Sequence, residues 1–356
     1  MDAPDVTVLG AGIVGAACAY YLAREGLSVT VVDRGGIAGG TTGAGEGNIL
    51  VSDKEPGPEL SLAVRSNRLW RELDFPDVEL EAKGGLVVTT SPAEQEALDA
   101  LAATQTGVES QAVAPHDVEP HLGPGVTGGR FYPQDMQVQP MLAAAAFLRA
   151  SKASVRLGTT VTGLARGRVE TTDGVISTGV VINAMGVWAG ELTGLPVMPR
   201  RGFILVTSKV PGLVRHKVYA ASYVAAVGSS EADLQMSPVV ESTQAGSVLI
   251  GSSRERVGFD STMSLPVLRQ LAASAVELFP ALANVQVIRA YKGFRPYMPD
   301  HLPAIGATEP WLYHACGHEG AGVGLAPVTG SLLASLITGS APIVDPAPFS
   351  PLRFGA

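Results

Sequence analysis

The chain has 356 residues, of which 46% are hydrophobic and 16% are charged, and its formal net charge at pH 7 is −8. This composition predicts a soluble enzyme of two domains, and its acidic balance argues against nucleic acid or an anionic membrane as a partner. Cys18 and Cys316 are the only cysteines and offer no disulfide framework. Because the first residues lack a basic leader and no apolar run reaches the ~18 residues of a membrane span, we expect a cytoplasmic protein.

The start of the chain carries the pattern of a dinucleotide-binding motif. An apolar run leads into Gly10-Ala-Gly12-Ile-Val-Gly15, a helical pattern follows, and a second apolar run ends on Asp33. Gly10 permits a tight turn, Gly12 lets the backbone approach a pyrophosphate, and Gly15 lets the helix pack against the strand. The carboxylate of Asp33 can hold ribose hydroxyls. The pattern predicts adenine-dinucleotide binding, and a βαβ unit without a ligand is the alternative.

The later elements alternate between strand and helix patterns. We expect strands at 84–90, 180–182, 203–207, 247–251 and 311–314, and a hairpin that turns at 172–174. We expect one helix to begin at 92 and further helices at 140–150, 265–278 and about 327–337. Glycine-rich turns follow strands at 40–48, 183–188 and 317–324. A nicotinamide enzyme does not need these additional turns, whereas a longer cofactor makes several backbone contacts, so the pattern favours FAD over NAD.

Taken together, these segments resemble the D-amino acid oxidase / glycine oxidase family of FAD enzymes over nearly the whole chain. The resemblance depends on the first motif and on 40–48, 183–189, 293–296 with 300–306, and 317–322. Segments 48–54 and 251–256 most resemble the bacterial group of D-hydroxyproline dehydrogenase, opine oxidase and hydrogen cyanide synthase subunits. The chain departs from the family at Asp33, where Glu is usual, and at Phe203, where a polar Gln is common. No cysteine stands near Arg295, so we expect a non-covalent FAD.

The resemblance implies an α/β fold with two domains. A Rossmann-like FAD-binding domain of the glutathione-reductase type is expected from residues 1–75, 138–195 and 292–356. A second α+β domain, built on an antiparallel sheet, is expected to bind the substrate and to consist of residues 76–137 and 196–291.

The cofactor contacts expected from the motifs and the resemblance come from all the glycine-rich turns. Thr41 and Thr42 can donate hydroxyls to the pyrophosphate, Gly47 and Asn48 let the backbone pass near the flavin, and the 317–324 turn places N–H groups near its ring. The expected FAD-binding residues are Gly10, Gly12, Ile13, Val14, Gly15, Asp33, Arg34, Thr41, Thr42, Gly47, Asn48, Val161, Ala184, Gly186, Trp188, Gly317, His318, Glu319, Gly320, Ala321 and Gly322.

For the substrate, the resemblance implies that Arg295 pairs bidentately with an α-carboxylate, which a planar guanidinium does well. The alternative is an arginine that is solvated or paired in the core. Tyr219 and Tyr223 are further catalytic candidates that can donate to the same carboxylate, and they are equally explained as half-buried strand aromatics. Arg201 is expected to begin a strand and pair an acid.

Other polar residues in or near the glycine-rich turns carry weaker signals. His314, Cys316 and His318 form a His-x-Cys-x-His pattern, but no second ligand cluster accompanies it, so we expect no metal. Glu46 and Glu319 can take a proton or be solvated loop charges.

The expected reaction is oxidation of a small α-amino or imino acid by hydride transfer from Cα to flavin N5, which leaves an imine. Electrons then pass to O₂ or to a redox partner subunit. An NAD-dependent dehydrogenase and a non-catalytic flavin-bearing subunit of a larger complex are the alternatives. The sequence leaves open whether the protein forms a homo-oligomer or a hetero-oligomer.

Overall fold

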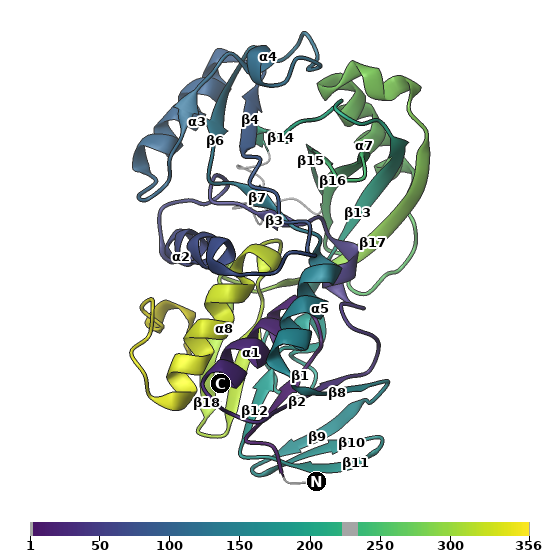
Figure 1. Cartoon of the computed structure of the whole chain (residues 1–356). Coiled ribbons are helices and arrows are strands. Elements are labelled where there is room, and N and C mark those ends of the chain that lie inside the picture. The colour runs from purple at the N-terminus through teal and green to yellow at the C-terminus, as the bar shows by residue number, and fades with distance from the viewer. Residues whose placement is uncertain (1–2, 223–233, 356) are drawn as a thin grey trace.

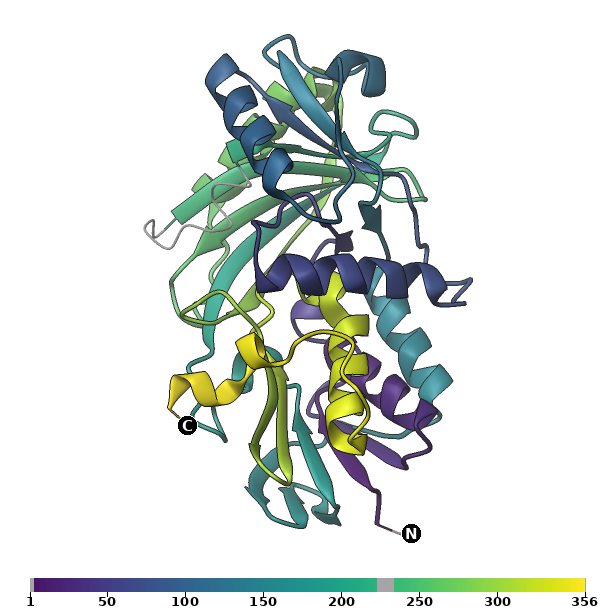
Figure 2. The same ribbon diagram turned by 90° about the vertical axis from the view of Figure 1, so that its left-hand side faces the viewer.

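The computed structural model describes residues 3–222 and 234–355. It consists of a lower α/β layer and an upper layer with a large, mainly antiparallel sheet, and helix α2 (Pro58–Glu72) lies across the waist between them (Figures 1 and 2). This arrangement confirms the predicted fold class.

The lower layer is built on a six-stranded sheet in the order β18-β19-β12-β1-β2-β8. Its pairs are parallel except β18 with β19. The strands are β1 (Val6–Leu9), β2 (Val29–Asp33), β8 (Ser154–Leu157), β12 (Val180–Asn183), β18 (Ala304–Glu309) and β19 (Leu312–Cys316). Because both faces are covered at the centre of the sheet, β1, β2 and β12 are mostly apolar and buried.

Helices cover one face of this sheet and a small sheet covers the other (Figure 1). Val8 and Ile182 pack on the helical side, while Leu9 and Val181 pack against the small sheet. The helices are α1 (Ile13–Arg24), α5 (Pro140–Ser151) and α8 (Gly322–Thr338), and the small sheet contains β9 (Val161–Ala165), β10 (Arg168–Thr171) and β11 (Gly174–Ser177).

The upper layer is an eight-stranded sheet in the order β17-β13-β16-β15-β14-β4-β6-β5. Only β4 and β14 pair in parallel among the described strands of this sheet. The strands are β4 (Gly85–Thr89), β5 (Gln111–Ala112), β6 (Gly128–Tyr132), β13 (Met198–Lys209), β14 (Lys217–Ala220), β15 (Leu234–Ser242), β16 (Ser247–Glu255) and β17 (Val287–Tyr297). Helices α3 (Pro92–Thr104), α4 (Pro115–Val118) and α7 (Leu265–Leu278) accompany them.

Local sequence signals account for several element bounds. At the start of α3, Ser91 Oγ accepts a hydrogen bond of 3.3 Å from Glu94 N, and Glu94 Oε2 accepts one of 2.7 Å from Thr90 N. The expected helix at 265–278 coincides with α7. The last helix was expected near Pro327 but begins at Gly322, with Pro327 inside it. Packing of α8 against α1 and α2 outweighs the backbone hydrogen bond that this proline cannot make.

The division into domains at the expected boundaries stays a prediction. Residue 292 lies within β17, which is one continuous strand paired with β13 along its length. A domain boundary at 291/292 would therefore cut through a continuous strand. Strands β13 and β17 instead run from the upper sheet toward the lower layer, which brings side chains of both layers to one place (Figure 1).

Candidate functional site

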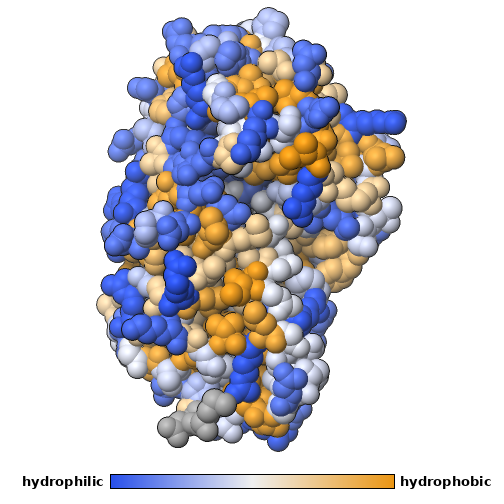
Figure 3. Space-filling model, turned by 45° about the vertical axis from the view of Figure 1, so that its right-hand side comes forward, coloured by the Kyte–Doolittle hydropathy of each residue, from blue (hydrophilic) through white to orange (hydrophobic). Residues whose placement is uncertain are grey.

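A cavity of about 360 Å³ lies where the ends of β1, β2 and β12 meet β13 and β17. Ligands bind at this edge of an open parallel sheet in many α/β proteins. On the face drawn in Figure 3, pale and orange residues gather across the middle of the molecule, between its upper and lower parts. The cavity is lined by the turns after β1, β2, β12 and β19 and by residues of β13 and β17.

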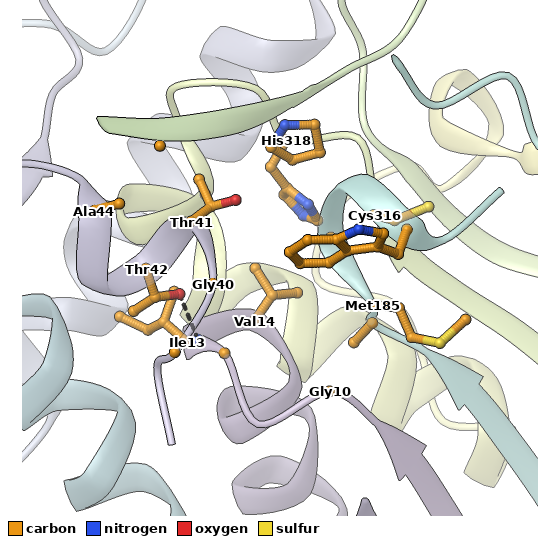
Figure 4. A pocket seen from close by; sticks show the side chains of 18 of the residues that line it. Gly10, Ile13, Val14, Gly40, Thr41, Thr42, Ala44, Met185, Cys316 and His318 are labelled. Atoms are coloured by element: carbon orange, nitrogen blue, oxygen red, sulfur yellow. Dashed lines mark hydrogen bonds between the residues drawn. The ribbon is translucent and has the colours of Figure 1, made fainter. Parts of the chain in front are cut away.

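The turn after β1 owes its close packing to glycine. Gly10 has a φ of +110°, and a Cβ there would overlap the carbonyl oxygen of Ala184, while a Cβ on Gly15 would overlap that of Gly10. Helix α1 begins at Ile13, whose N–H donates 3.1 Å to Thr42 Oγ1, and its Gly12 N-cap has no side-chain cap among the described residues (Figure 4). The helix N-terminus therefore presents N–H groups to the cavity, which favours an anion.

The strand-end acid and an aromatic wall flank this helix terminus. Asp33 Oδ2 accepts 2.7 Å from Ala11 N and its Oδ1 accepts 2.7 Å from Gly35 N. Arg34 lies with its guanidinium carbon 4.0 Å from the ring centroid of Trp188, and both residues line the cavity. Asp33 thus holds the turn after β1 against the turn after β2.

At the other end of the cavity the guanidinium of Arg295 lies against glycines. Its Nη1 donates 2.8 Å to Ser253 O. A Cβ on Gly202 would overlap Nη1, and a Cβ on Gly320 would lie 3.8 Å from Nε. Glycine at these positions leaves room for the guanidinium beside the 318–320 loop.

Glu319 in that loop is held by two basic side chains. Its Oε1 accepts 2.6 Å from Arg200 Nη1, and its Oε2 lies 3.1 Å from His301 Nδ1. Burial on its own would raise the pKa of Glu319, but the hydrogen bond with His301 and the charges of Arg254 and Arg200 bring that pKa to about 2. Glu319 is ionised at neutral pH, so it does not have the protonation behaviour of a base that works near pH 7.

The residues of the His-x-Cys-x-His pattern have separate partners. His314 Nε2 lies 2.9 Å from Thr308 Oγ1, and His318 Nε2 lies 2.9 Å from Thr329 Oγ1. Cys316 is buried and free. Within 3–222 and 234–355, no group of three or more His, Cys, Asp or Glu side chains is placed to hold a metal ion.

Most of the expected cofactor residues line this one cavity. Those that do are Gly10, Gly12, Ile13, Val14, Asp33, Arg34, Thr41, Thr42, Asn48, Val161, Ala184, Gly186, Trp188, His318, Glu319, Gly320 and Gly322. Figure 4 shows Ile13, Val14, Thr41, Thr42 and His318 around it. Their contacts with a cofactor stay predictions.

Four expected cofactor residues lie behind the cavity wall instead. A Cβ on Gly47 would overlap Val138 O, one on Gly317 would overlap Met298, and Gly15 packs on Gly10. Ala321 lines a smaller neighbouring cavity. These glycines are therefore required by packing against the protein itself, which a glycine-rich pattern does not distinguish from packing against a ligand.

Of the two tyrosine candidates, Tyr219 lies within the described residues and does not line the cavity. Tyr219 is fully buried, its hydroxyl contacts Ser52 Oγ, and its ring packs with Val87 and Tyr132. Its place in β14 directs Tyr219 into this core, which favours the alternative of a strand aromatic, and a contact with a substrate carboxylate stays a prediction. Tyr223 lies outside the described residues. Arg201 pairs with Glu255 and Asp260, as expected.

Several cavity residues were not expected from the sequence. Gly202 and Ile204 of β13, Gly293 of β17, and Thr159 and Thr160 after β8 line the cavity. Gly202 and Gly293 each carried a signal, because a glycine within a strand pattern marks a close approach. Nothing in an ordinary apolar strand distinguishes Ile204 from a core residue.

Known proteins resemble this chain over most of its length. The chain matches the DAO family model, described as FAD dependent oxidoreductase, over residues 5–336. It is 31% identical over 375 residues to glycine oxidase of Pseudomonas putida, with 98% of each chain covered. It is 30% identical over 415 residues to hydrogen cyanide synthase subunit HcnC of Pseudomonas aeruginosa, with 98% of this chain and 96% of the relative covered.

Solved structures give the same picture. Glycine oxidase from Geobacillus kaustophilus superposes with a TM-score of 0.87 at 25% identity, over 98% of both chains. L-proline dehydrogenase from P. horikoshii superposes with a TM-score of 0.88 at 25% identity, over 99% of this chain and 98% of that one.

No helix in the described residues is long and apolar enough to cross a membrane.

The cofactor implied by these matches is FAD, and the cavity fits it. The glycine turn and the open N-terminus of α1 suit a pyrophosphate, and Asp33 stands at the strand end where a ribose is held. The same cavity continues to the 318–322 turn and Arg295, which gives room for a second ring system. FAD, rather than NAD, is therefore the cofactor.

Proposed function

The chain belongs to the DAO family of FAD-dependent oxidoreductases, and we propose that it oxidises the carbon–nitrogen bond of a small α-amino or imino acid. When bound, FAD accepts the two electrons of the substrate's α-C–H bond as a hydride. The names of the relatives support the substrate class, because they include glycine oxidase and L-proline dehydrogenase.

The observation that carries the proposal is Arg295, a half-buried cation in the same cavity as the glycine turns. Its Nη1 donates to Ser253 O, and the glycines at 202 and 320 place no side chain against the planar group. A guanidinium fixed in this way binds a carboxylate through two parallel hydrogen bonds and so sets both position and rotation of the substrate. A small apolar side chain would contact Ile204 and Pro296.

Substitution of Arg295 tests this proposal. Arg295→Lys keeps the charge but loses the two-pronged geometry, and Arg295→Met loses both, so KM should rise in both variants and kcat should fall. The loss of a charge-assisted contact corresponds to ~1.5–3 kcal/mol, which is roughly tenfold to 150-fold in kcat/KM. Steady-state kinetics with the best amino acid substrate measures both constants.

Two controls make the result specific. Arg289→Lys, on the exposed part of the same strand β17, should leave the kinetics unchanged. An amine that lacks the carboxylate should be a poor substrate of the parent and lose little more in the variants. Normal amino acid oxidation by Arg295→Met, or wholesale loss of FAD, would show that Arg295 is structural.

The electron acceptor is O₂ or a redox partner subunit. The name of the P. aeruginosa relative, a subunit of hydrogen cyanide synthase, supports a search for a partner. Rapid reoxidation of the reduced protein by air would favour O₂, and slow reoxidation would favour a partner. We propose a cytoplasmic location on the basis of the two buried free thiols, Cys18 and Cys316.

A further inference from the structure

A second charged group, Glu46, lines the same cavity as Arg295. Its side chain is 8% exposed, and its Oε1 has no hydrogen-bond partner among the described residues. Its Oε2 accepts one long hydrogen bond of 3.3 Å from Asn48 Nδ2. An ionised carboxylate can accept about four hydrogen bonds, so most of this capacity is unused.

A second acceptor stands beside this carboxylate. Asn48 also lines the cavity, and because its amide nitrogen donates to Glu46, its Oδ1 is the remaining acceptor. Oδ1 is buried and has no hydrogen-bond partner in the described parts of the chain. Two buried acceptors without donors are costly in an empty protein, and a ligand that brings several N–H donors would satisfy both.

The basic groups that act on Glu46 also have other partners. Lys217, fully buried in β14, forms an ion pair with Glu241 of β15. Burial, the largest influence, leaves the pKa of Glu46 raised, with Glu241 adding to the increase and Lys217 and Arg295 acting against it. Tyr291 of β17 also faces Glu46 and is neutral. When a substrate carboxylate takes up the charge of Arg295, the pKa of Glu46 rises further, and a cation beside Glu46 would keep its carboxylate ionised.

The space around Glu46 is shaped for its side chain. A Cβ on Gly251 would lie 2.7 Å from Glu46 Oε1 and 3.0 Å from Ile204 Cδ1. Gly251 therefore lets the carboxylate lie beside the apolar Ile204. A charge–charge contact in such a dry place is stronger than at the surface.

We propose that Glu46, with Asn48 Oδ1, binds the protonated amine of the substrate while Arg295 binds its carboxylate. This inference rests on the proposed function and refines its substrate class. Substrates enter as zwitterions with a basic nitrogen, so primary α-amino acids and cyclic secondary amino acids are accepted. The α-hydroxy acids and N-acyl amino acids, which carry no cationic nitrogen, are not.

Two unreactive ligands of the same shape isolate the amine. α-Aminoisobutyrate has no α-hydrogen and cannot be oxidised, and pivalate replaces its ammonium group by a methyl group. Both keep the carboxylate, so the ratio of the pivalate Kd to the α-aminoisobutyrate Kd reports the amine contact alone. Isothermal titration calorimetry on the FAD-loaded protein measures this ratio without turnover.

Glu46→Gln keeps the shape of the side chain and removes its charge. We expect the Kd ratio to exceed ten in the parent and to fall at least tenfold in Glu46→Gln, while Glu46→Asp retains a ratio above that of Glu46→Gln. Glu191→Gln removes an exposed acid from the cavity rim and should leave the ratio within twofold. A ratio in Glu46→Gln within twofold of the parent would overturn the inference.

The proposed function and this inference fail in different ways. Arg295→Met should weaken both ligands alike, and unchanged binding of both would refute the carboxylate contact of the proposed function whatever Glu46 does. If Glu46→Gln does not fold, the parent decides alone, since equal or tighter binding of pivalate contradicts the inference. If neither ligand binds, the Ki of the desamino acid divided by the Kd of a good substrate, taken from the concentration dependence of anaerobic flavin reduction, replaces this ratio.

Discussion

At the scale of single residues, Asp33 shows how one carboxylate serves both fold and cofactor. Both of its oxygens already accept backbone hydrogen bonds, from Ala11 and Gly35, so it connects two of the turns that line the cavity. Its second lone pairs remain for ribose hydroxyls. A strand-end acid after a glycine fingerprint could be predicted from the sequence, whereas its role in joining the turns could not, because that depends on the positions of N–H groups.

Asp33→Asn is the sharpest variant at this position. The amide keeps one acceptor but places N–H donors where a charged acceptor stood, so FAD affinity should fall by ~1–3 kcal/mol. Titration of the FAD-free protein with FAD, followed by flavin fluorescence, measures the change. Turnover at saturating FAD should be nearly unchanged, and an unaltered FAD affinity would show that the acid only holds the turns.

His318 illustrates a buried titratable group in the cavity wall. Thr329 Oγ1 donates 2.9 Å to Leu325 O, so it accepts from His318 Nε2–H, which fixes the neutral tautomer. Burial lowers the pKa of His318 to about 4 and that of His314 to about 4. The folded protein thus keeps both rings neutral at a pH where the unfolded chain protonates them.

This difference predicts an acid-side loss of stability. As the pH falls from the unfolded histidine pKa of ~6.5 toward 4, the unfolded state binds more protons, so the free energy of unfolding decreases, by up to ~1.4 kcal/mol per pH unit for each histidine. In His318→Gln the slope between pH 6.5 and 4.5 should be smaller by about one proton. Urea unfolding at several pH values measures it, and identical slopes for variant and parent would contradict the assignment.

At the scale of elements, small residues bring α1 close to its neighbours. A Cβ on Gly330 of α8 would lie 2.7 Å from Ala17 O of α1, and Gly15 leaves no room for a Cβ beside Gly10. The pattern of glycines predicted α1 correctly from the sequence. The start of α8 could not be predicted as well, because Pro327 is a local stop signal and only the buried packing of α8 overrides it.

Gly15→Ala tests this packing against intrinsic propensity. Alanine favours a helix by ~1 kcal/mol over glycine, yet the added methyl overlaps the Gly10 carbonyl, and overpacking costs ~1–3 kcal/mol or more. We expect a lower midpoint of urea unfolding and weaker FAD retention. Gly125→Ala, in a turn with open space around it, should change stability by at most ~0.5 kcal/mol. Equal stability of the two variants would show that the turn adapts freely.

At the scale of the whole molecule, the cavity is made by bringing segments from far along the chain together. Residues from the segments 10–14, 40–48, 184–188, 293–296 and 315–323 contribute to it, and most of these segments carried glycine or charge signals that could be read in order. The contributions of Ile204 and Thr160 could not be predicted, because they depend on how β13 and β8 lie against the other segments. The two interpretations of Tyr219 could not be decided from the sequence, because a strand pattern does not tell which face meets the cavity.

The central claim is that this cavity holds FAD and that a small amino or imino acid reduces it. Anaerobic titration of the FAD-loaded protein tests this directly, with glycine, N-methylglycine and both enantiomers of alanine and proline as reductants, and lactate as a hydroxy acid control. The account predicts that at least one amino acid bleaches the visible absorbance of the flavin completely, that lactate does not, and that Arg295→Met slows the bleaching. Flavin that dithionite reduces but that none of these amino acids reduces would contradict the account.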